Sequence, residues 1–208
     1  MISISYAITA STEVVELQRL LSTLVKFKRK EDEIILQLDR DNFDPIIMDI
    51  KEIKNKQIDL THIVPLNRDF AAFKNSLKKY CSKDYIFFID ADECPTEYML
   101  TILSDVIENN RVDVILVPRI NTVVGITDED IKKWKWNVND KNWINYPDYQ
   151  YRICKNIPEI FWKNKVHEVL DGHRSISYLP HNIHEFALIH EKTIGKQRKQ
   201  NEFYNTLC

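Results

Sequence analysis

The sequence predicts an α/β fold in which a mostly parallel central sheet is flanked by helices. Strand-like and helix-like segments alternate through residues 1–118 at the spacing of βαβ units. Residues 85–89 form an unbroken apolar run, Tyr-Ile-Phe-Phe-Ile, which is typical of a strand buried on both faces of such a sheet. Polar side chains follow the predicted strands, at the end where α/β proteins bind their ligands.

The first strand and helix are expected within residues 2–30. Residues 2–9 alternate and are rich in β-branched side chains, which indicates a strand. Ser11 or Thr12 is expected to cap the helix that follows, whose apolar residues recur at helical spacing over residues 14–25. The basic residues 26–30 suit the carboxyl end of that helix.

The same alternation continues to residue 117. The segments expected next are strands at residues 33–38 and 58–65, a helix opened by Asn67-Arg68-Asp69, the apolar strand at residues 85–89, a helix from Pro95 to about residue 109, and a strand at residues 112–117.

Polar residues occupy the loops after the first four strands, at residues 9–13, 39–42, 66–69 and 90–93. Because the carboxyl ends of parallel strands meet at one edge of a sheet, these loops predict a single crevice of nucleotide size. The chain has only three glycines and no glycine-rich phosphate loop. A nucleotide in this crevice would therefore be held by side chains and a metal ion.

Asp90 and Asp92 flank Ala91 directly after the apolar strand. An Asp-x-Asp pair at a strand end can aim two carboxylates at one point, and such ligands suit Mg²⁺ or Mn²⁺ that also binds a phosphate. The alternative is an acidic turn that ends the strand and caps the next helix.

The second half has a different character. All four tryptophans lie between residues 134 and 162, among tyrosines, lysines and asparagines. Aromatic faces beside polar groups can hold sugar rings, but the same residues can form the core of an irregular segment. Short strands are expected at residues 149–154 and 160–162, and a basic helix at residues 196–207. We expect one domain over residues 1–208, in which residues 119–208 pack on residues 1–118.

Composition narrows the function classes. The 29 basic and 31 acidic residues nearly cancel, which argues against a nucleic-acid partner. The four cysteines lack C-x-x-C spacing, so zinc and redox motifs are not expected. Neither a signal peptide nor a transmembrane segment is evident, and a cytoplasmic protein is expected.

Three stretches together resemble glycosyltransferase family 2, whose members have the GT-A fold. They are ISYAITASTEVVELQRLLSTL, PLNRDFAAFKNSLKKYCSKDYIFFIDADE and YRICKNIPEIFWKNKVHEVL. The resemblance implies a metal-dependent hexosyltransferase that uses Mn²⁺ or Mg²⁺ and a nucleoside-diphosphate sugar, by default a UDP-sugar. It further implies a saccharide, glycolipid or glycoprotein acceptor, a hydroxyl of which is glycosylated mostly with inversion. On this resemblance, residues 1–118 would be the nucleotide-sugar-binding half, and residues 119–208 the acceptor-binding half with the C-terminal helix.

The resemblance also implies roles for individual residues. Thr9, Ala10 and Glu13 match the loop that holds the base and ribose, and Asp39 matches the acidic residue that pairs with the base. Asp69 and Lys74 match the loop and helix that face the nucleotide. Asp90, Ala91 and Asp92 match the metal-binding motif, and His190 resembles the late histidine of the metal or diphosphate site. On chemical grounds, Arg152 and Lys165 are candidate cations for the diphosphate, and surface salt bridges are the alternative.

An inverting transferase needs a carboxylate that deprotonates the acceptor hydroxyl. The family's usual Glu-Asp pair is matched only by Glu129-Asp130, which lies in a polar loop without an evident scaffold. Glu168 lies in a stretch that resembles the family and is the preferred base. The alternative is that Glu168 belongs to a hydrogen-bonded turn that shapes the acceptor pocket. Two rival functions stay open. A nucleotidyltransferase also uses paired aspartates but needs a basic glycine-rich loop, and a non-catalytic nucleotide- or carbohydrate-binding protein would keep the fold without turnover.

Overall fold

The computed structural model describes residues 2–205, and the side chains of residues 2–202. Its α-helices are α1 (Val14–Phe27), α2 (Lys51–Lys54), α3 (Phe70–Lys78), α4 (Glu97–Asn110), α5 (Asp128–Trp134) and α6 (Ile194–Asn205). Two short 3-10 helices are η1 (Pro45–Asp49) and η2 (His184–Phe186). The helix expected to reach residue 207 is thus described only to Asn205, and its last residues lie outside the described chain.

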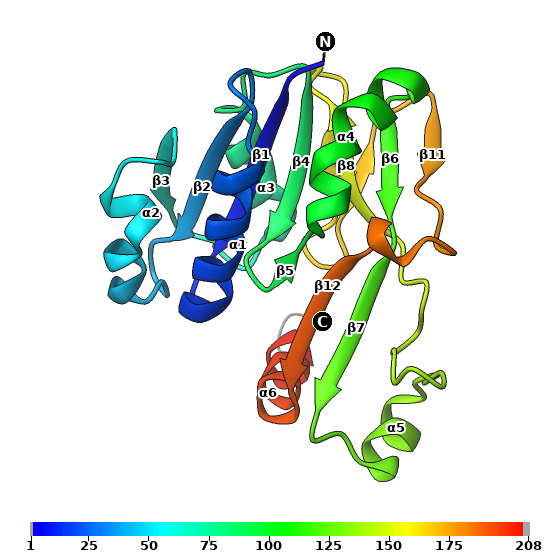
Figure 1. Cartoon of the computed structure of the whole chain (residues 1–208). Coiled ribbons are helices and arrows are strands. Elements are labelled where there is room, and N and C mark those ends of the chain that lie inside the picture. The colour runs from blue at the N-terminus through cyan, green and yellow to red at the C-terminus, as the bar shows by residue number, and fades with distance from the viewer. Residues whose placement is uncertain (1, 206–208) are drawn as a thin grey trace.

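The described strands form one large sheet and two small ones (Figure 1). The large sheet contains β1 (Ile4–Ala10), β2 (Glu33–Asp39), β3 (Leu60–Val64), β4 (Tyr85–Asp90), β6 (Val114–Val117), β8 (Gln150–Lys155) and β11 (Ile176–Tyr178). The small sheets contain β5 (Glu93–Cys94), β7 (Arg119–Val124) and β12 (Leu188–Thr193), and β9 (Phe161–Lys163) with β10 (Val169–Asp171).

The large sheet has the order β11-β6-β8-β4-β1-β2-β3. All its neighbours pair in parallel except β8, which runs antiparallel to both β4 and β6. The expected α/β architecture with a mostly parallel sheet is therefore confirmed. The short strand expected at residues 149–154 is β8, which lies between β4 and β6. The sequence indicated the strand but not this position in the sheet.

Helices cover both faces of the sheet, as the apolar strand predicted. Phe87 and Ile89 of β4 pack in the cluster that contains the buried residues of α1 and α4. Ile86 and Phe88 point to the opposite face, where α3 and the β9–β10 pair cover them. Trp162 belongs to this second cluster, with its ring 5.1 Å from that of Phe88. For this tryptophan, the core interpretation is correct.

Several helix boundaries differ from the predictions. Glu13, not Ser11 or Thr12, is the N-cap of α1, and no side chain caps that helix. Thr96 caps α4 by accepting a hydrogen bond from the Met99 amide, so Pro95 precedes the helix instead of opening it. The helices η1 and α2, which lie between β2 and β3, were not predicted from the sequence.

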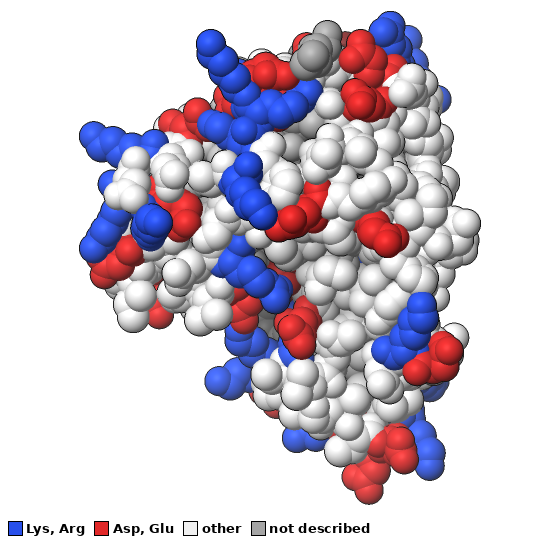
Figure 2. All heavy atoms as spheres, in the orientation of Figure 1, with Lys and Arg blue, Asp and Glu red and all other residues white. Residues whose placement is uncertain are grey.

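Charge and hydropathy are distributed without long single-sign or apolar stretches. On the face shown in Figure 2, basic and acidic side chains are interspersed, in keeping with their near balance in the sequence. No helix within residues 2–205 has the length and apolar character that crossing a membrane requires.

Candidate active site

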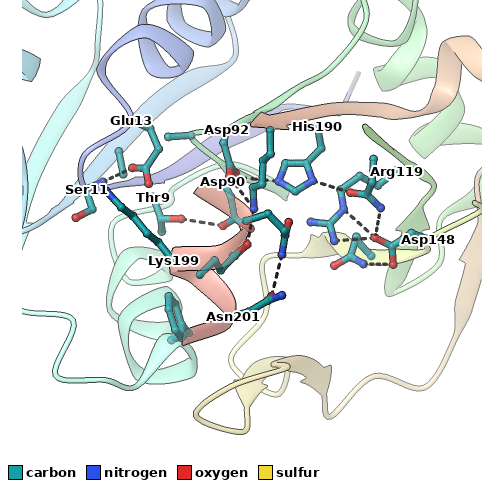
Figure 3. A pocket seen from close by; sticks show the side chains of 18 of the residues that line it. Thr9, Ser11, Glu13, Asp90, Asp92, Arg119, Asp148, His190, Lys199 and Asn201 are labelled. Carbon is teal, nitrogen blue, oxygen red and sulfur yellow. Dashed lines mark hydrogen bonds and ion pairs between the residues drawn. The ribbon is translucent and has the colours of Figure 1, made fainter. Parts of the chain in front are cut away.

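A cavity of about 890 Å³ lies at the carboxyl ends of the parallel strands. The four predicted loops all contribute to its wall, through residues 9–13, Asp39 and Asn42, Leu66, and residues 90–92. The opposite wall comes from β7, β8, β12 and α6 (Figure 3). The four loops therefore do meet at one edge of the sheet, as their positions after successive strands predicted.

Asp90, the last residue of β4, is held by protein groups on both of its oxygens. Its Oδ1 accepts a hydrogen bond from Thr9 Oγ1 at 2.9 Å and lies 3.1 Å from Lys74 Nζ. Its Oδ2 accepts a hydrogen bond from Arg152 Nη2 at 2.7 Å. Burial alone would raise the pKa of Asp90, but the charges of Arg152 and Lys74 outweigh it and hold this pKa far below its usual value.

Asp92 has a different environment. Its Oδ2 lies 3.2 Å from His190 Nε2 and 3.2 Å from Lys192 Nζ, and a quarter of its side chain (25%) is exposed to the cavity. Burial raises the pKa of Asp92, whereas His190 and Lys192 lower it by more, so the carboxyl group is ionised at neutral pH. Both contacts come from β12, which therefore positions the second carboxylate.

The orientation of His190 follows from its neighbours. Asn121 Nδ2 donates to Asp148 Oδ2 at 2.8 Å, and because a carboxylate only accepts, the amide oxygen must face the histidine. That oxygen lies 2.6 Å from His190 Nδ1, which therefore carries a hydrogen. The lone pair of neutral His190 Nε2 then points at Asp92, and two acceptors face each other unless a proton or a cation lies between them.

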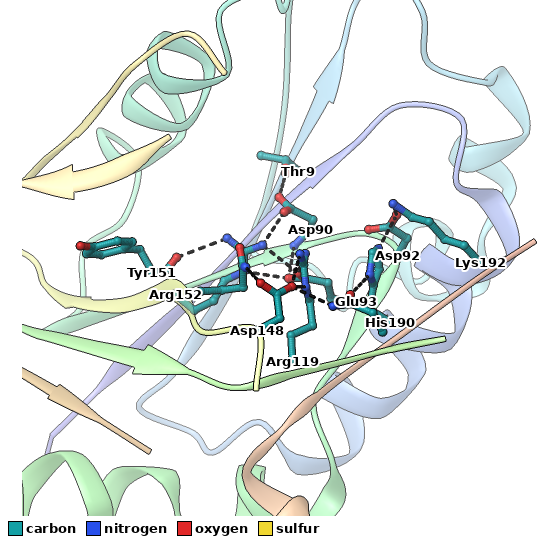
Figure 4. Close-up of polar contacts among 12 residues, drawn as sticks. Thr9, Asp90, Asp92, Glu93, Arg119, Asp148, Tyr151, Arg152, His190 and Lys192 are labelled. Atoms are coloured by element: carbon teal, nitrogen blue, oxygen red, sulfur yellow. Dashed lines mark hydrogen bonds and ion pairs between the residues drawn. The ribbon is translucent and has the colours of Figure 1, made fainter. Parts of the chain in front are cut away.

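A chain of alternating charges connects the two aspartates (Figure 4). Arg152 donates to Asp90 and, with two hydrogen bonds of 2.8 and 2.7 Å, to Glu93. Arg119 bridges Glu93, at 2.8 Å, and Asp148, at 2.7 Å. Asp148 in turn orients Asn121 and thereby His190. Burial of Arg152 disfavours its charge, but Asp90 and Glu93 overcome this and raise its pKa.

The corner formed by Asp92 and His190 fits a divalent cation. One carboxylate oxygen and one imidazole nitrogen are ligands that Mn²⁺ accepts, and Asn121 already fixes the tautomer that such a ligand needs. Among the described residues, no group of three or more His, Cys, Asp or Glu side chains could hold a metal alone. The remaining ligands would be phosphate oxygens and water, as is usual for Mg²⁺. Asp90 is less suited because cations already engage both of its oxygens.

Glu168 lines the cavity beside the same motif. Its Oε1 accepts a hydrogen bond of 2.6 Å from Lys74, whose side chain is almost completely buried and lies 4.8 Å from the ring of Trp162. No residue with a described side chain donates a hydrogen bond to Glu168 Oε2. Glu129 and Asp130, the other candidate pair, lie on α5 outside the cavity wall, where Asp130 forms a capping box with Thr127.

The remaining predicted site residues divide into two groups. Thr9, Ala10, Glu13, Asp39, Ala91 and Arg152 line the cavity together with Asp90, Asp92, Glu168 and His190. Asp69, Lys74 and Lys165 do not line it: Asp69 caps α3 through the Ala72 amide, Lys74 is buried behind Asp90, and exposed Lys165 offers its carbonyl oxygen to the Phe70 amide.

Sequence reasoning missed several cavity residues. Arg119, Asn121 and Asp148 belong to segments that carry no motif. The pairing of β7 with β12 brings Asn121 to His190, and Asp148 joins them by accepting hydrogen bonds from Arg119 and Asn121. Trp136 lines the cavity with its ring 4.7 Å from that of Trp134. The aromatic cluster of residues 134–162 gave a signal for it, but did not distinguish it from the core tryptophan.

Comparisons with known proteins bear on the family and the fold of the chain. The family model described as Glycosyl transferase family 2 matches residues 5–192. The crystal structure of S. aureus TarS 1–349 is similar at a TM-score of 0.61 and 16% identity, over 92% of this chain and 60% of that one. Its complex with UDP-GlcNAc has a TM-score of 0.62 at 16% identity, over 92% of this chain and 59% of that one. A longer form of S. aureus TarS has a TM-score of 0.62 at 14% identity, over 92% of this chain and 37% of that one.

These likenesses confirm the GT-A fold expected from the sequence. The chain spans about 60% of the length of TarS 1–349. None of the curated proteins matches the chain.

Proposed function

We propose, from the premise that the chain belongs to glycosyl transferase family 2, that it transfers a hexosyl group from a UDP-sugar to a hydroxyl of a saccharide-containing acceptor. The observation that carries this proposal is the position of Asp90, Asp92, His190 and Glu168 around one cavity at the strand ends. UDP is supported by the similar fold of S. aureus TarS 1–349, which has been crystallised with UDP-GlcNAc.

The loops of residues 9–13 and 39–42 form the end of the cavity that we assign to the nucleotide. Glu13 lies there with its carboxylate accepting the Ser11 amide at 2.8 Å, and burial raises its pKa. Asp39 is buried and accepts the Leu66 amide at 3.0 Å, which fixes its carboxylate at the wall. Both carboxylates are acceptors for the N–H and O–H donors of a base and ribose.

The diphosphate belongs at Asp92 and His190. A divalent cation bound there would act as a Lewis acid that offsets the charge of the departing diphosphate. Asp90 would contribute through its fixed place beside Thr9, and Lys192 neutralises Asp92 when no ligand is bound. Because Arg152 is bound to Asp90 and Glu93, it stabilises these carboxylates instead of contacting the diphosphate.

Glu168 is the proposed general base. Lys74 orients it through Oε1, which leaves Oε2 to accept the proton of the acceptor hydroxyl. The acceptor oxygen then forms its bond to the anomeric carbon while the bond from that carbon to the diphosphate oxygen breaks, with inversion. Trp136 and Asn145 line the acceptor end of the cavity, where an indole face suits a sugar ring.

A thermal-shift experiment with UDP and UDP-sugars, each with and without Mn²⁺ or Mg²⁺, tests the donor assignment. A ligand at about a hundred times its Kd adds roughly 2.7 kcal/mol to the free energy of unfolding. For a chain of this length that corresponds to a rise in Tm of about 5–11 °C. The metal-dependent part of the rise should vanish in Asp92→Ala. If UDP and its sugars leave the Tm unchanged, the proposal is wrong.

Turnover distinguishes a transferase from a non-catalytic binding protein. Glu168→Gln keeps the Lys74 contact but cannot accept the proton, so kcat should fall about a hundred- to ten-thousand-fold. Its Kd for UDP should stay at the wild-type value. UDP release measured with a panel of saccharide acceptors gives kcat, and a Glu168→Gln enzyme with undiminished kcat would exclude Glu168 as the base.

A further inference from the structure

Helix α6 forms part of the cavity wall, and one of its lysines faces the ligand space. Gln197, Lys199, Gln200 and Asn201 all line the cavity. In the close-up, Lys199 projects from α6 toward the side of the cavity that Thr9 and Ser11 line (Figure 3). Because Thr9 also binds Asp90, Lys199 borders the junction between the nucleotide end and the diphosphate end of the donor region.

Contacts on either side of Lys199 explain this placement. Lys196 pairs with Glu16 in the first turn of α1, directly after the loop of residues 11–13. Arg198 pairs with Asp130 of α5 at 3.0 Å. These two ion pairs fasten α6 across the cavity between α1 and α5, which leaves the side chain of Lys199 to point inward.

The other basic side chains of the cavity wall are committed to carboxylates of the protein. Arg152 is 4% exposed and binds Asp90 and Glu93. Arg119 binds Glu93 and Asp148, and Lys192 binds Asp92 and Gln200. Lys199 is the one cavity-lining Lys or Arg for which the described residues supply no ion pair or hydrogen bond.

The net charge around the site explains why the Lys199 ammonium group matters. Asp90, Glu93 and Asp148 neutralise the charges of Arg119 and Arg152, so these two arginines offer little positive charge to a bound anion. A donor's diphosphate is anionic, and its charge grows as the sugar departs. A cation on the side opposite His190 would contact the phosphate oxygens that a metal ion at Asp92 leaves unpaired.

We propose that Lys199 binds the diphosphate of the nucleotide-sugar donor, so that the terminal helix completes the donor site. This inference rests on the proposed function. It replaces the earlier candidates Arg152, which is buried in internal ion pairs, and Lys165, which lies outside the cavity wall. It also assigns α6 to donor binding, whereas the sequence suggested the acceptor half.

The test compares Lys199→Gln, Lys199→Arg and the matched control Lys132→Gln, which removes the same charge from an exposed position on α5. Calorimetry in the presence of Mn²⁺ gives the Kd of each protein for UDP, uridine and inorganic pyrophosphate. Loss of a charge-assisted hydrogen bond should weaken UDP and pyrophosphate about ten- to a hundredfold in Lys199→Gln. Uridine should bind all proteins equally, and Lys199→Arg should retain most of the UDP affinity.

The outcomes separate the two proposals. If wild-type protein binds UDP and Lys199→Gln binds it within about twofold, the role of Lys199 is wrong while the donor assignment stands. Equal weakening of uridine and UDP would show that the substitution displaces α6, and would also overturn a diphosphate contact. If the wild-type protein binds neither UDP nor pyrophosphate, the proposed function itself fails.

Discussion

Replacing Arg152 by methionine tests whether the charge chain behind the motif stabilises the fold. The Arg152 side chain is 4% exposed, and its guanidinium group donates three hydrogen bonds of 2.7–2.8 Å, two to Glu93 and one to Asp90. Methionine keeps much of the side-chain volume and removes the charge. Among the described residues, Glu93, whose side chain is fully buried, then keeps Arg119 as its one cation.

The cost follows from the charges left behind. Removing one partner of a buried ion pair typically costs about 3–5 kcal/mol, because the remaining charge is desolvated without compensation. For a protein of this length, we expect a fall in Tm of roughly 6–20 °C. Adding Glu93→Gln to Arg152→Met removes one of the orphaned charges. The double variant should therefore be more stable than the sum of the two single effects predicts, by about 0.5–3 kcal/mol.

Urea unfolding of wild type, both single variants and the double variant gives the four free energies of this cycle. The slope m should stay constant, which shows that the native and unfolded states remain comparable. A loss below about 1 kcal/mol for Arg152→Met, or additive effects in the double variant, would contradict a buried and coupled charge chain.

Three further predictions concern other parts of the cavity. Asn121→Leu releases the Nδ1 side of His190 and should weaken Mn²⁺ binding about ten- to a hundredfold, measured by electron paramagnetic resonance of free Mn²⁺; unchanged affinity would argue against the tautomer relay. Burial raises the pKa of Asp148, but Arg119 and further hydrogen bonds lower it by more, so the pKa is lower in the folded than in the unfolded protein. Ionised Asp148 therefore stabilises the fold at neutral pH, and this contribution is lost as the pH falls below about 4. Asp148→Asn should therefore destabilise the protein more at pH 7 than at about pH 3 in urea unfolding, and an equal loss would refute this. Trp136→Ala should raise the acceptor KM about tenfold without changing the Kd for UDP, and an unchanged KM would remove Trp136 from the acceptor site.

The sequence predicted the donor side of the fold well because that side is built from local patterns. Apolar runs and helical periodicity identified β1, β2, β4 and α1, and the parallel arrangement then placed the loops after these strands at one edge. The clustering of Thr9, Asp39 and Asp90 follows from strand order alone.

The other wall could not be predicted in this way. Residues 150–155 read as a strand, but nothing local shows that they insert antiparallel between β4 and β6 and so carry Arg152 to Asp90. Glu93 reads as the third acidic residue of a turn, whereas it is buried between two arginines that follow it by 26 and 59 residues. Such pairings depend on tertiary contacts that leave no periodic trace in the sequence.

The Asp-x-Asp motif also conceals a division of labour that the structure reveals. Asp90 ends β4 and is surrounded by Thr9, Lys74 and Arg152, so its charge is neutralised within the protein. Asp92 lies past the strand end, exposed to the cavity, and its partners His190 and Lys192 come from β12. The first carboxylate thus joins β1, α3 and β8 into one rigid edge. The second carboxylate is open to the cavity and can exchange its contact with Lys192 for a ligand, because Lys192 keeps its hydrogen bond to Gln200.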